Sequence, residues 1–256
     1  MPAAPVLRVE GLTVRYGALV ALERMTWEVE AGRILGIIGP NGAGKSSCFA
    51  AVTNSVVHAG EVFLDGRRVT DVPTWDLAAL GLRRTFQQNA FFGELTVLEN
   101  TMGAIISEHS TGLLTSIVAP WKETASRRRA AAEAERLLTA FGIDPAYHRR
   151  LPGSIPYGVQ RLLSVVLAYG LGARALLLDE PAAGTGGGDM RRLAPLLVDL
   201  RARGTAVVVI EHHMDLIMGV ADRIVVIDQG QRLAEGTPAE IQRNPAVLEA
   251  YLGRSA

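Results

Sequence analysis

The pattern of hydrophobic and polar residues predicts two kinds of β-strand. Apolar and polar residues alternate from Met25 to Glu30, as in a half-buried strand, and Val62 and Leu64 continue this pattern just before Asp65-Gly66, a strong hairpin signal. Other runs are almost continuously apolar, which is typical of strands covered on both faces in a parallel sheet. These runs are Ile34–Ile38, Ala175–Leu178, Ala206–Ile210 and Ile224–Ile227. The pattern therefore predicts an α/β fold with antiparallel strands beside a mainly parallel sheet.

Between these strand regions, the segment 89–170 has mainly helical patterning. Residues 127–141 are rich in strong helix formers, and the charged residues there, including the arginine triplet 127–129, are expected to form a solvated face. Contact of this triplet with a lipid surface is the alternative. The sequence contains no internal repeat, and its one glycine-rich run is 184–188.

Length and charge limit the classes of protein that the chain can belong to. Its 256 residues suit one sizeable domain, and its 26 basic and 26 acidic side chains argue against binding nucleic acid through bulk charge. The single cysteine, Cys48, excludes an intramolecular disulfide and fits a reducing compartment. The N-terminus lacks a signal-peptide pattern, and the longest apolar stretch, 162–178, contains Arg174 and is shorter than the about 20 residues that cross a bilayer. We therefore expect a cytoplasmic chain whose membrane role comes through a partner.

A complete phosphate-binding motif lies between an apolar strand and a predicted helix at Ser46–Thr53. Its glycines let backbone N–H groups point at phosphate oxygens, and the helix N-terminus adds positive charge. Lys45 would neutralise the β- and γ-phosphates, and the Ser46 hydroxyl would ligate Mg²⁺. A glycine-rich turn without a ligand is the alternative, and Cys48 is expected to pack in the helix. The candidate phosphate-binding residues are Gly39, Pro40, Asn41, Gly42, Ala43, Gly44, Lys45, Ser46 and Ser47.

The choice of lysine at position 45 is informative in itself. Lys45 and Lys122 are the only lysines among the 26 basic residues, so this chain uses arginine almost everywhere that either residue would serve. A compact ammonium fits a tightly wrapped phosphate loop, where a planar guanidinium would not.

Two carboxylates follow a second apolar strand in the segment 176–181. The carboxyl end of a buried strand is where ligands bind in doubly wound sheets. Asp179 would hold Mg²⁺ through water, and Glu180 would polarise the attacking water. An acidic pair in such a turn is commonplace, and the phosphate loop is what favours a functional role.

In this order the motifs resemble those of the ATP-binding-cassette family, from Val6 to Gly253. In that family an aromatic residue near the N-terminus stacks on adenine, and Tyr16 stands at that place; a tyrosine in the core of a strand is the alternative. Gln87, in Arg84-Thr85-Phe86-Gln87, resembles the glutamine loop, which senses Mg²⁺ and the attacking water while following the transmembrane partner. His212 resembles the switch histidine that contacts the γ-phosphate, and the adjacent His213 does not make the pair a zinc site. The resemblance thus implies Glu180, His212 and Gln87 as catalytic residues, and Ser46, Gln87 and Asp179 as Mg²⁺ ligands.

The segment at the place of the family's signature motif departs from its common form, Leu-Ser-Gly-Gly-Gln. Here it comprises Ile155, Pro156, Tyr157, Gly158, Val159 and Gln160. A subgroup with Tyr-Gly in the middle is similar to the ATPases of branched-chain amino acid importers, and the segments 179–184, 236–245 and 251–253 resemble that subgroup too.

In the family, the signature contacts the γ-phosphate bound by the opposite subunit. Pro156 offers neither hydroxyl nor N–H, which would lose a hydrogen bond to a charged oxygen worth about 1.5 to 3 kcal/mol, although proline is tolerated at a helix start. Val159 removes a further polar side chain, and Thr185-Gly186-Gly187 stand where the family usually carries Asp or Asn. The motifs that act within one chain are intact and those that act across the dimer are eroded, which favours an asymmetric heterodimer over a homodimer.

The resemblance implies a P-loop NTPase (RecA-like) core with a mainly parallel sheet, an N-terminal antiparallel β subdomain and an inserted α-helical subdomain. We expect one ABC ATPase domain at 5–253, with the core in 5–88 and 171–253 and the helical part in 89–170. The implied ligands are ATP and Mg²⁺. The implied partners are integral membrane permeases, which would hold the chain at the inner face of the cell membrane, a second ABC ATPase and, indirectly, a periplasmic or lipid-anchored binding protein, but no nucleic acid.

The implied function is import of branched-chain or other hydrophobic amino acids. The alternatives are a lipopolysaccharide-type exporter ATPase, a soluble ATPase in DNA repair or translation control, and a nucleotide-binding regulator that does not hydrolyse. A DNA-repair ATPase would carry a long heptad insertion and a translation ATPase two tandem cassettes, and the sequence has neither. Glu180 and His212 disfavour a regulator without hydrolysis.

Overall fold

The computed structural model describes residues 4–85, 90–106, 120–170, 172–184 and 187–252. An antiparallel sheet with strand order β2-β1-β4-β5 comes first. Within it, β1 (Pro5–Tyr16) pairs with β2 (Leu19–Glu30) and β4 (His58–Leu64), and β4 pairs with β5 (Arg67–Arg68). Asp65 and Gly66 join β4 to β5 with φ angles of 48° and 76°, as the hairpin signal predicted.

The second sheet is mainly parallel and has the strand order β10-β9-β3-β8-β7-β6. Its parallel strands are β3 (Ile34–Ile38), β6 (Leu82–Arg84), β7 (Ala175–Asp179), β8 (Ala206–Ile210) and β9 (Arg223–Asp228), and β10 (Gln231–Gly236) is antiparallel to β9. The apolar runs predicted the four central strands to within one residue. The short edge strand β6 escaped prediction because two of its three residues are arginines.

This parallel sheet separates two hydrophobic cores. Leu35 and Ile37 of β3 face the core shared with the antiparallel sheet and with α1 (Lys45–Val52). Ile34 and Ile38 face the opposite core, which most of the other helices complete. Alternate residues of one strand therefore anchor both layers. Cys48 is fully buried in the first core, as expected.

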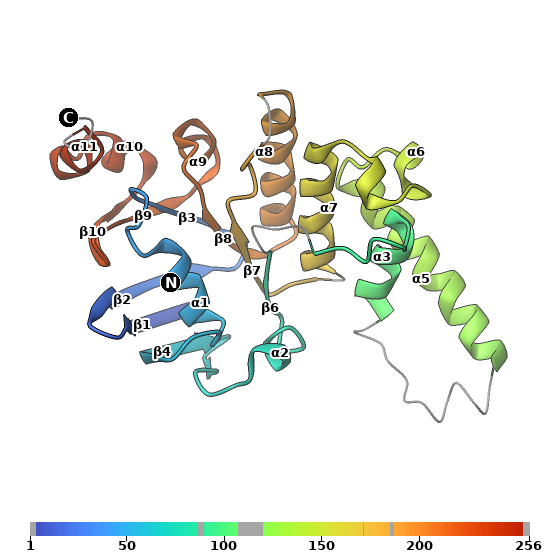
Figure 1. Cartoon of the computed structure of the whole chain (residues 1–256), viewed down its shortest axis with the longest axis horizontal. Helices are drawn as coiled ribbons and strands as arrows, with labels where there is room; N and C mark the ends of the chain where they lie inside the picture. The colour runs from blue at the N-terminus through green and yellow to red at the C-terminus, as the bar shows by residue number, and fades with distance from the viewer. Residues whose placement is uncertain (1–3, 86–89, 107–119, 171, 185–186, 253–256) are drawn as a thin grey trace.

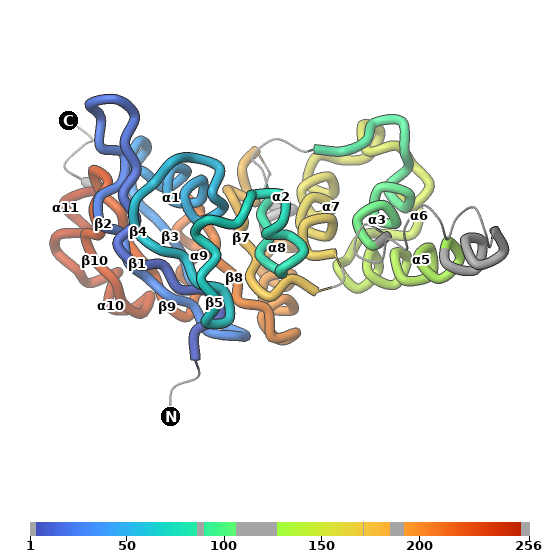
Figure 2. Tube along the Cα trace, turned by 90° about the horizontal axis from the view of Figure 1, so that it is seen from below, coloured from blue at the N-terminus to red at the C-terminus, as the bar shows by residue number. Residues whose placement is uncertain are grey.

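Most helices cover the second face of the parallel sheet or extend to one side of it. In Figures 1 and 2, α3 (Val97–Ile106), α5 (Pro120–Ala140), α6 (Pro145–His148) and α7 (Tyr157–Tyr169) lie together, away from the antiparallel sheet. A short 3₁₀ turn, Pro152–Ser154, precedes α7, and α2 (Thr74–Leu77) precedes β6. The C-terminal half adds α8 (Gly187–Ala202), α9 (Met214–Val220), α10 (Pro238–Gln242) and α11 (Pro245–Leu252). No described helix combines the length and apolar character that spanning a membrane requires.

The strand order brings the candidate functional residues together at one edge of the parallel sheet. Neighbouring parallel strands β3, β8 and β7 end, respectively, at the loop before Lys45, at Glu211-His212 and at Asp179-Glu180. Because the carboxyl ends of parallel strands meet at the same edge, motifs more than a hundred residues apart in sequence become neighbours.

Candidate functional site

The loop between β3 and α1 has a backbone that only glycine tolerates at two of its positions. Gly39 and Gly44 have φ angles of 153° and 105°. A Cβ on Gly39 would lie 2.0 Å from the Ile227 carbonyl oxygen, and one on Gly44 would lie 2.3 Å from the Ala21 carbonyl oxygen. These close approaches fix the path of the loop and place the N-terminus of α1 at Lys45.

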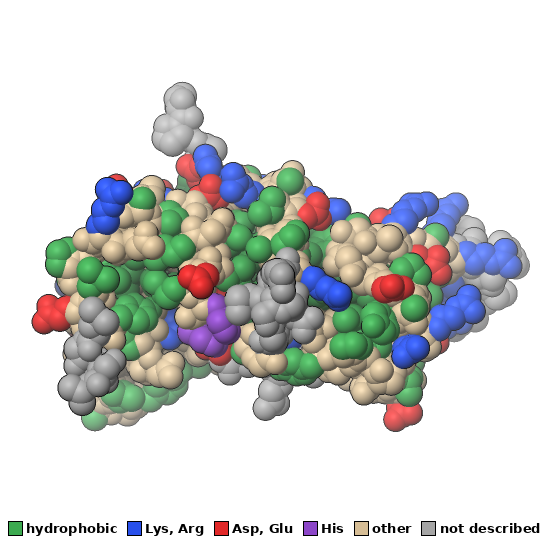
Figure 3. Space-filling view, turned by 90° about the horizontal axis from the view of Figure 1, so that it is seen from above, with side chains coloured by type: hydrophobic (Ala, Val, Ile, Leu, Met, Phe, Trp, Pro, Cys, Tyr) green, Lys and Arg blue, Asp and Glu red, His purple; other side chains and the backbone are tan. Residues whose placement is uncertain are grey.

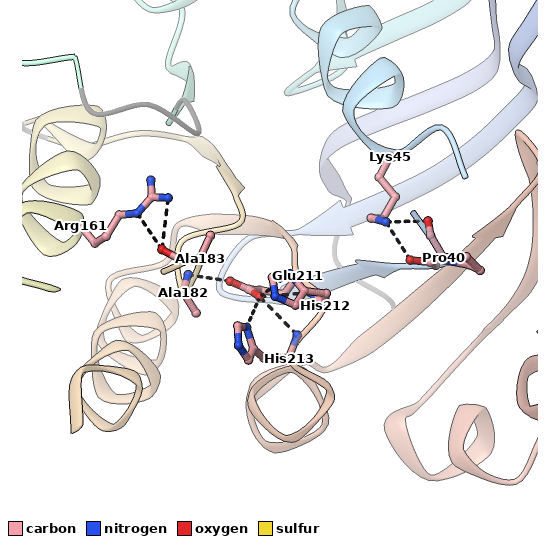
Figure 4. Close-up of polar contacts among 9 residues, drawn as sticks. Pro40, Lys45, Arg161, Ala182, Ala183, Glu211, His212 and His213 are labelled. Carbon is pink, nitrogen blue, oxygen red and sulfur yellow. Dashed lines mark hydrogen bonds and ion pairs between the residues drawn. The ribbon is translucent and has the colours of Figure 1, made fainter. Parts of the chain in front are cut away.

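The Lys45 side chain lies back across this loop. It is 7% exposed, and its Nζ donates to the carbonyl oxygens of Gly39 at 2.7 Å and Pro40 at 2.9 Å (Figure 4). Burial lowers the pKa of Lys45, while the carboxylates of Glu180 and Asp179 act in the opposite direction. A buried ammonium next to a helix N-terminus is a favourable place for an anion such as phosphate.

A cavity of about 480 Å³ opens in front of this lysine. Its lining brings together Tyr16 from the end of β1, the phosphate loop, and Glu180 from the end of β7. Tyr16 is 49% exposed, so the alternative of a core tyrosine is wrong. The described lining residues are Tyr16, Leu19, Val20, Ala21, Asn41, Gly42, Ala43, Gly44, Lys45, Ser46, Ser47, Glu180, Gln229 and Gly230.

Glu180 occupies a strained turn at the end of β7. Its φ angle is 47°, in the left-handed region that non-glycine residues seldom adopt, and its N–H donates to the Ile210 carbonyl oxygen at 2.9 Å. Such strain persists only where the surroundings enforce it, and it clusters at functional sites. From this turn Glu180 contributes to the lining of the cavity.

Asp179 is buried, and it is ion-paired to a residue whose role sequence reasoning missed. Its Oδ2 atom accepts from Arg84 Nη2 at 2.7 Å, and the two side chains are 2% and 14% exposed. Arg84 comes from the unpredicted strand β6, parallel to β7. The Asp179 N–H also donates to the Thr85 hydroxyl at 3.1 Å. In the register of these strands Arg84 lies opposite Leu177, two residues before Asp179, and the sequence alone gives no signal that the strands are neighbours.

The remaining carboxylate oxygen of Asp179 supports its candidate role as a metal ligand. Oδ1 is buried and has no hydrogen-bond partner among the described residues. A buried carboxylate oxygen is rarely left unpaired, and carboxylate and hydroxyl oxygens are the donors that Mg²⁺ prefers. With Ser46 in the adjacent cavity lining, the residues present fit a magnesium ion.

His212 stands beside this site without lining its cavity among the described residues. Its side chain is 50% exposed, and histidine side chains reach the surface on the face that Figure 3 shows. The His212 and His213 rings lie 4.2 Å apart between centroids. Both follow Glu211, a fully buried residue that sequence reasoning did not single out.

The signature segment stands at the start of α7. None of residues 155–160 is in the described lining of this chain's own cavity. Pro156 is the N-cap of α7, so proline does stand at a helix start, and it is exposed together with Tyr157. Val159 is 3% exposed and packs in the helical core. Its lack of a polar group therefore changes the core rather than the exposed end of the helix. Gln160 donates to the Ile155 carbonyl oxygen at 3.0 Å.

Two predicted features lie outside the described residues. They are the candidate catalytic glutamine, Gln87, and the pair Thr185-Gly186, where the family usually carries Asp or Asn. Their roles stay predictions.

The models of two protein families together match most of the chain. A family model described as ABC transporter matches residues 22–183, and one described as branched-chain amino acid ATP-binding cassette transporter matches residues 231–256.

Curated relatives align over nearly their whole length. The high-affinity branched-chain amino acid transport ATP-binding protein LivG of Escherichia coli is 37% identical over 257 residues, covering 98% of this chain and 99% of that protein. BraF of Pseudomonas aeruginosa, with the same description, is 37% identical over 253 residues at the same coverage. The fructose import ATP-binding protein FrcA of Rhizobium meliloti is 29% identical and covers 96% of this chain and 94% of its own length.

Solved structures agree with the fold. The ADP conformation of MJ1267, an ATP-binding cassette of an ABC transporter, superposes with a TM-score of 0.83 at 26% identity, covering 98% of this chain and all of that one. A dimeric post-hydrolysis cassette, MJ0796 bound to ADP and phosphate, has a TM-score of 0.74 at 21% identity, with 91% and 98% coverage.

Proposed function

The chain belongs to the ATP-binding subunits of ABC transporters, and on this premise we propose that it hydrolyses ATP to drive uptake of branched-chain amino acids through separate membrane permeases. The observation that carries the proposal is the single cavity in which the phosphate loop, Lys45 and Glu180 meet. A strained carboxylate facing a buried ammonium across a cavity is suited to directing water at a phosphate held by that ammonium.

Each candidate residue has a distinct task in hydrolysis. Tyr16 stacks on adenine at the mouth of the cavity, and the loop N–H groups with Lys45 hold the phosphates. Glu180 orients the attacking water, and His212 contacts the γ-phosphate once the site closes. Gln87, from the segment after β6, completes the set.

Ser46, Asp179 and Gln87 would hold Mg²⁺, whose charge offsets that of the phosphate oxygens. Arg84 supplies a positive charge beside Asp179.

The cargo is proposed from the relatives. LivG and BraF are described as branched-chain amino acid transport proteins, and the specific C-terminal family model covers residues 231–256. The fructose importer ATPase is a more distant match, at 29% identity. A binding protein outside the membrane and the permeases would select the amino acid, because the residues that line the cavity suit a nucleotide.

A groove at the end of β6 is our candidate for the permease contact. A cavity of about 810 Å³ there is lined from α2, β6 and α7, and one of its lining residues, Trp75, is 79% exposed. Arg84 lines the groove and also binds Asp179, so a partner seated there would act on the strand that contacts the nucleotide site. We also propose that 5–253 is divided into a core, 5–88 with 171–253, and an inserted helical part, 89–170. The described helices α3, α5, α6 and α7 of the helical part lie together, away from the antiparallel sheet (Figure 1).

The complete hydrolytic site would contain a second ATPase chain. Pro156 and Tyr157 of the signature segment are exposed at the start of α7, and none of residues 155–160 is in the described lining of this chain's own cavity. The segment would face the nucleotide of a partner, and Pro156 weakens that contact. A heterodimer with a related ATPase carrying an intact signature is favoured over a homodimer, and the assembly would sit on the inner face of the membrane.

Reconstitution tests this function directly. Proteoliposomes carrying the chain, its two permeases, a binding protein and the second ATPase should take up leucine when ATP is supplied inside. Glu180→Gln should abolish uptake and Glu61→Gln, an exposed change, should not. Absence of leucine uptake together with active ATP hydrolysis would refute the cargo and leave the ATPase assignment intact. Vigorous hydrolysis by the chain alone would contradict the asymmetric dimer.

A further inference from the structure

Glu211 joins the two loops that carry the candidate catalytic residues. It directly follows β8, is fully buried, and its Oε1 atom accepts from the Ala182 N–H at 2.6 Å. Its Oε2 atom accepts from the His212 N–H at 3.1 Å and from His213 Nδ1 at 3.0 Å. A buried carboxylate that is saturated with donors is held rigidly, because each broken bond exposes an uncompensated charge. Glu211 therefore fixes the loop of His212 to the loop that follows Glu180.

The same loop is held on its other side by α7. Arg161, 6% exposed, donates through Nε and Nη2 to the Ala183 carbonyl oxygen, both at 3.4 Å. Its guanidinium also lies 5.4 Å from the centre of the Tyr157 ring. A Cβ on Gly184 would approach that ring to 3.1 Å, so Tyr157 packs directly on the loop.

These contacts form a continuous path within one chain. Figure 4 shows Arg161 reaching the Ala183 carbonyl group and Glu211 reaching the neighbouring Ala182 N–H group, with His212 and His213 beyond. Ala183 thus binds the cation of Arg161, from the helix that begins with the signature segment. The adjacent Ala182 binds the anion of Glu211, from the loop of the switch histidine.

We infer that Glu211 and Arg161 are positioning residues that couple the placement of His212 to the placement of this chain's own signature helix. This inference rests on the proposed function, because the signature would face the partner's nucleotide. A shift of α7 on binding that nucleotide would move the loop 181–184 and, through Glu211, the switch histidine. Neither residue is among the described residues that line the cavity, so both would act through other groups.

A double-substitution cycle in the full-length chain with its partner ATPase tests the coupling. Glu211→Gln preserves side-chain size but replaces one acceptor oxygen with a donor, and Arg161→Met removes the donors to Ala183. Each should lower kcat about tenfold or more with KM for ATP within about twofold, a tenfold loss being 1.36 kcal/mol. Arg161→Lys, which retains a donor, should recover part of kcat. In the double variant, the two losses should combine to much less than their product.

The exposed pair Glu61 and Arg68, at 3.0 Å on the antiparallel sheet, provides the matched control cycle and should leave kcat unchanged. A second readout needs no nucleotide: Glu211→Gln should raise amide hydrogen exchange several-fold in the first turns of α7. Multiplicative kcat losses, a change confined to KM, or unchanged exchange in α7 would overturn the coupling. Failure of the wild-type chain to bind ATP would instead refute the proposed function, and the exchange experiment would still decide the coupling.

Discussion

Replacing Arg84 with methionine should destabilise the nucleotide-free chain strongly. The change removes the cation that lies 2.7 Å from Asp179 Oδ2 and leaves a carboxylate that is only 2% exposed without its partner. Breaking a buried ion pair from one side costs about 3 to 5 kcal/mol, since the remaining charge is uncompensated. For a domain of this size, about 2 to 4 °C of Tm is lost per kcal/mol, so Tm should fall by roughly 6 to 20 °C.

Chemical unfolding in urea, followed by tryptophan fluorescence, measures this loss. Asp179→Asn in the same chain removes the orphaned charge, so Arg84→Met/Asp179→Asn should be less destabilised than the sum of the two single variants. Mg-ADP should stabilise Arg84→Met more than it stabilises the wild type, because a bound divalent cation restores positive charge beside Asp179. A cost below about 1 kcal/mol for Arg84→Met, the level of an exposed pair, would refute the reasoning, as would additive effects in the double variant.

Three further predictions concern the phosphate loop, the adenine contact and the buried core behind α1. Gly44→Ala should abolish ATP binding in a calorimetric titration because its Cβ would lie 2.3 Å from the Ala21 carbonyl oxygen, whereas Gly103→Ala in α3, with nothing within 4 Å of the added Cβ, should retain it; equal affinities would contradict the packing argument. Tyr16→Ala should weaken ATP about 5- to 150-fold, the range for loss of one base-stacking contact, without altering the affinity for inorganic triphosphate; a matching loss for triphosphate would exclude stacking. Burial raises the pKa of Cys48 from 9.0 to about 12, so the folded state keeps a proton that the unfolded state releases, and stability should fall as pH rises from 9 toward 12. Cys48→Ala should remove that part of the decline in urea unfolding, and an unchanged pH profile would contradict it.

The sequence predicted the structure best at positions where both the local backbone and the surrounding packing restrict the type of residue. The apolar runs identified β3 and β8 to the residue because strands covered on both faces admit almost no polar side chain. The phosphate loop was equally clear, since glycine is required at Gly39 and Gly44, where a Cβ would lie within 3 Å of a carbonyl oxygen.

Other features depend on tertiary neighbours and leave little local signal. β6 has three residues, two of them arginine, and one of these arginines is explained by an aspartate ninety-five positions later. Glu211 resembles any acidic residue at a strand end until Ala182 is seen to donate to it. The strain at Glu180 is likewise visible only in the backbone angle.

Equilibrium binding of Mg-ATP to the purified chain, compared between the wild type and Lys45→Ala, tests the central claim most directly. The account predicts saturable one-site binding by the wild type and a loss of at least about tenfold in affinity for the variant, since a hydrogen-bonded charge contact is worth about 1.5 to 3 kcal/mol. Equal affinities, or no binding by folded wild-type protein, would contradict it.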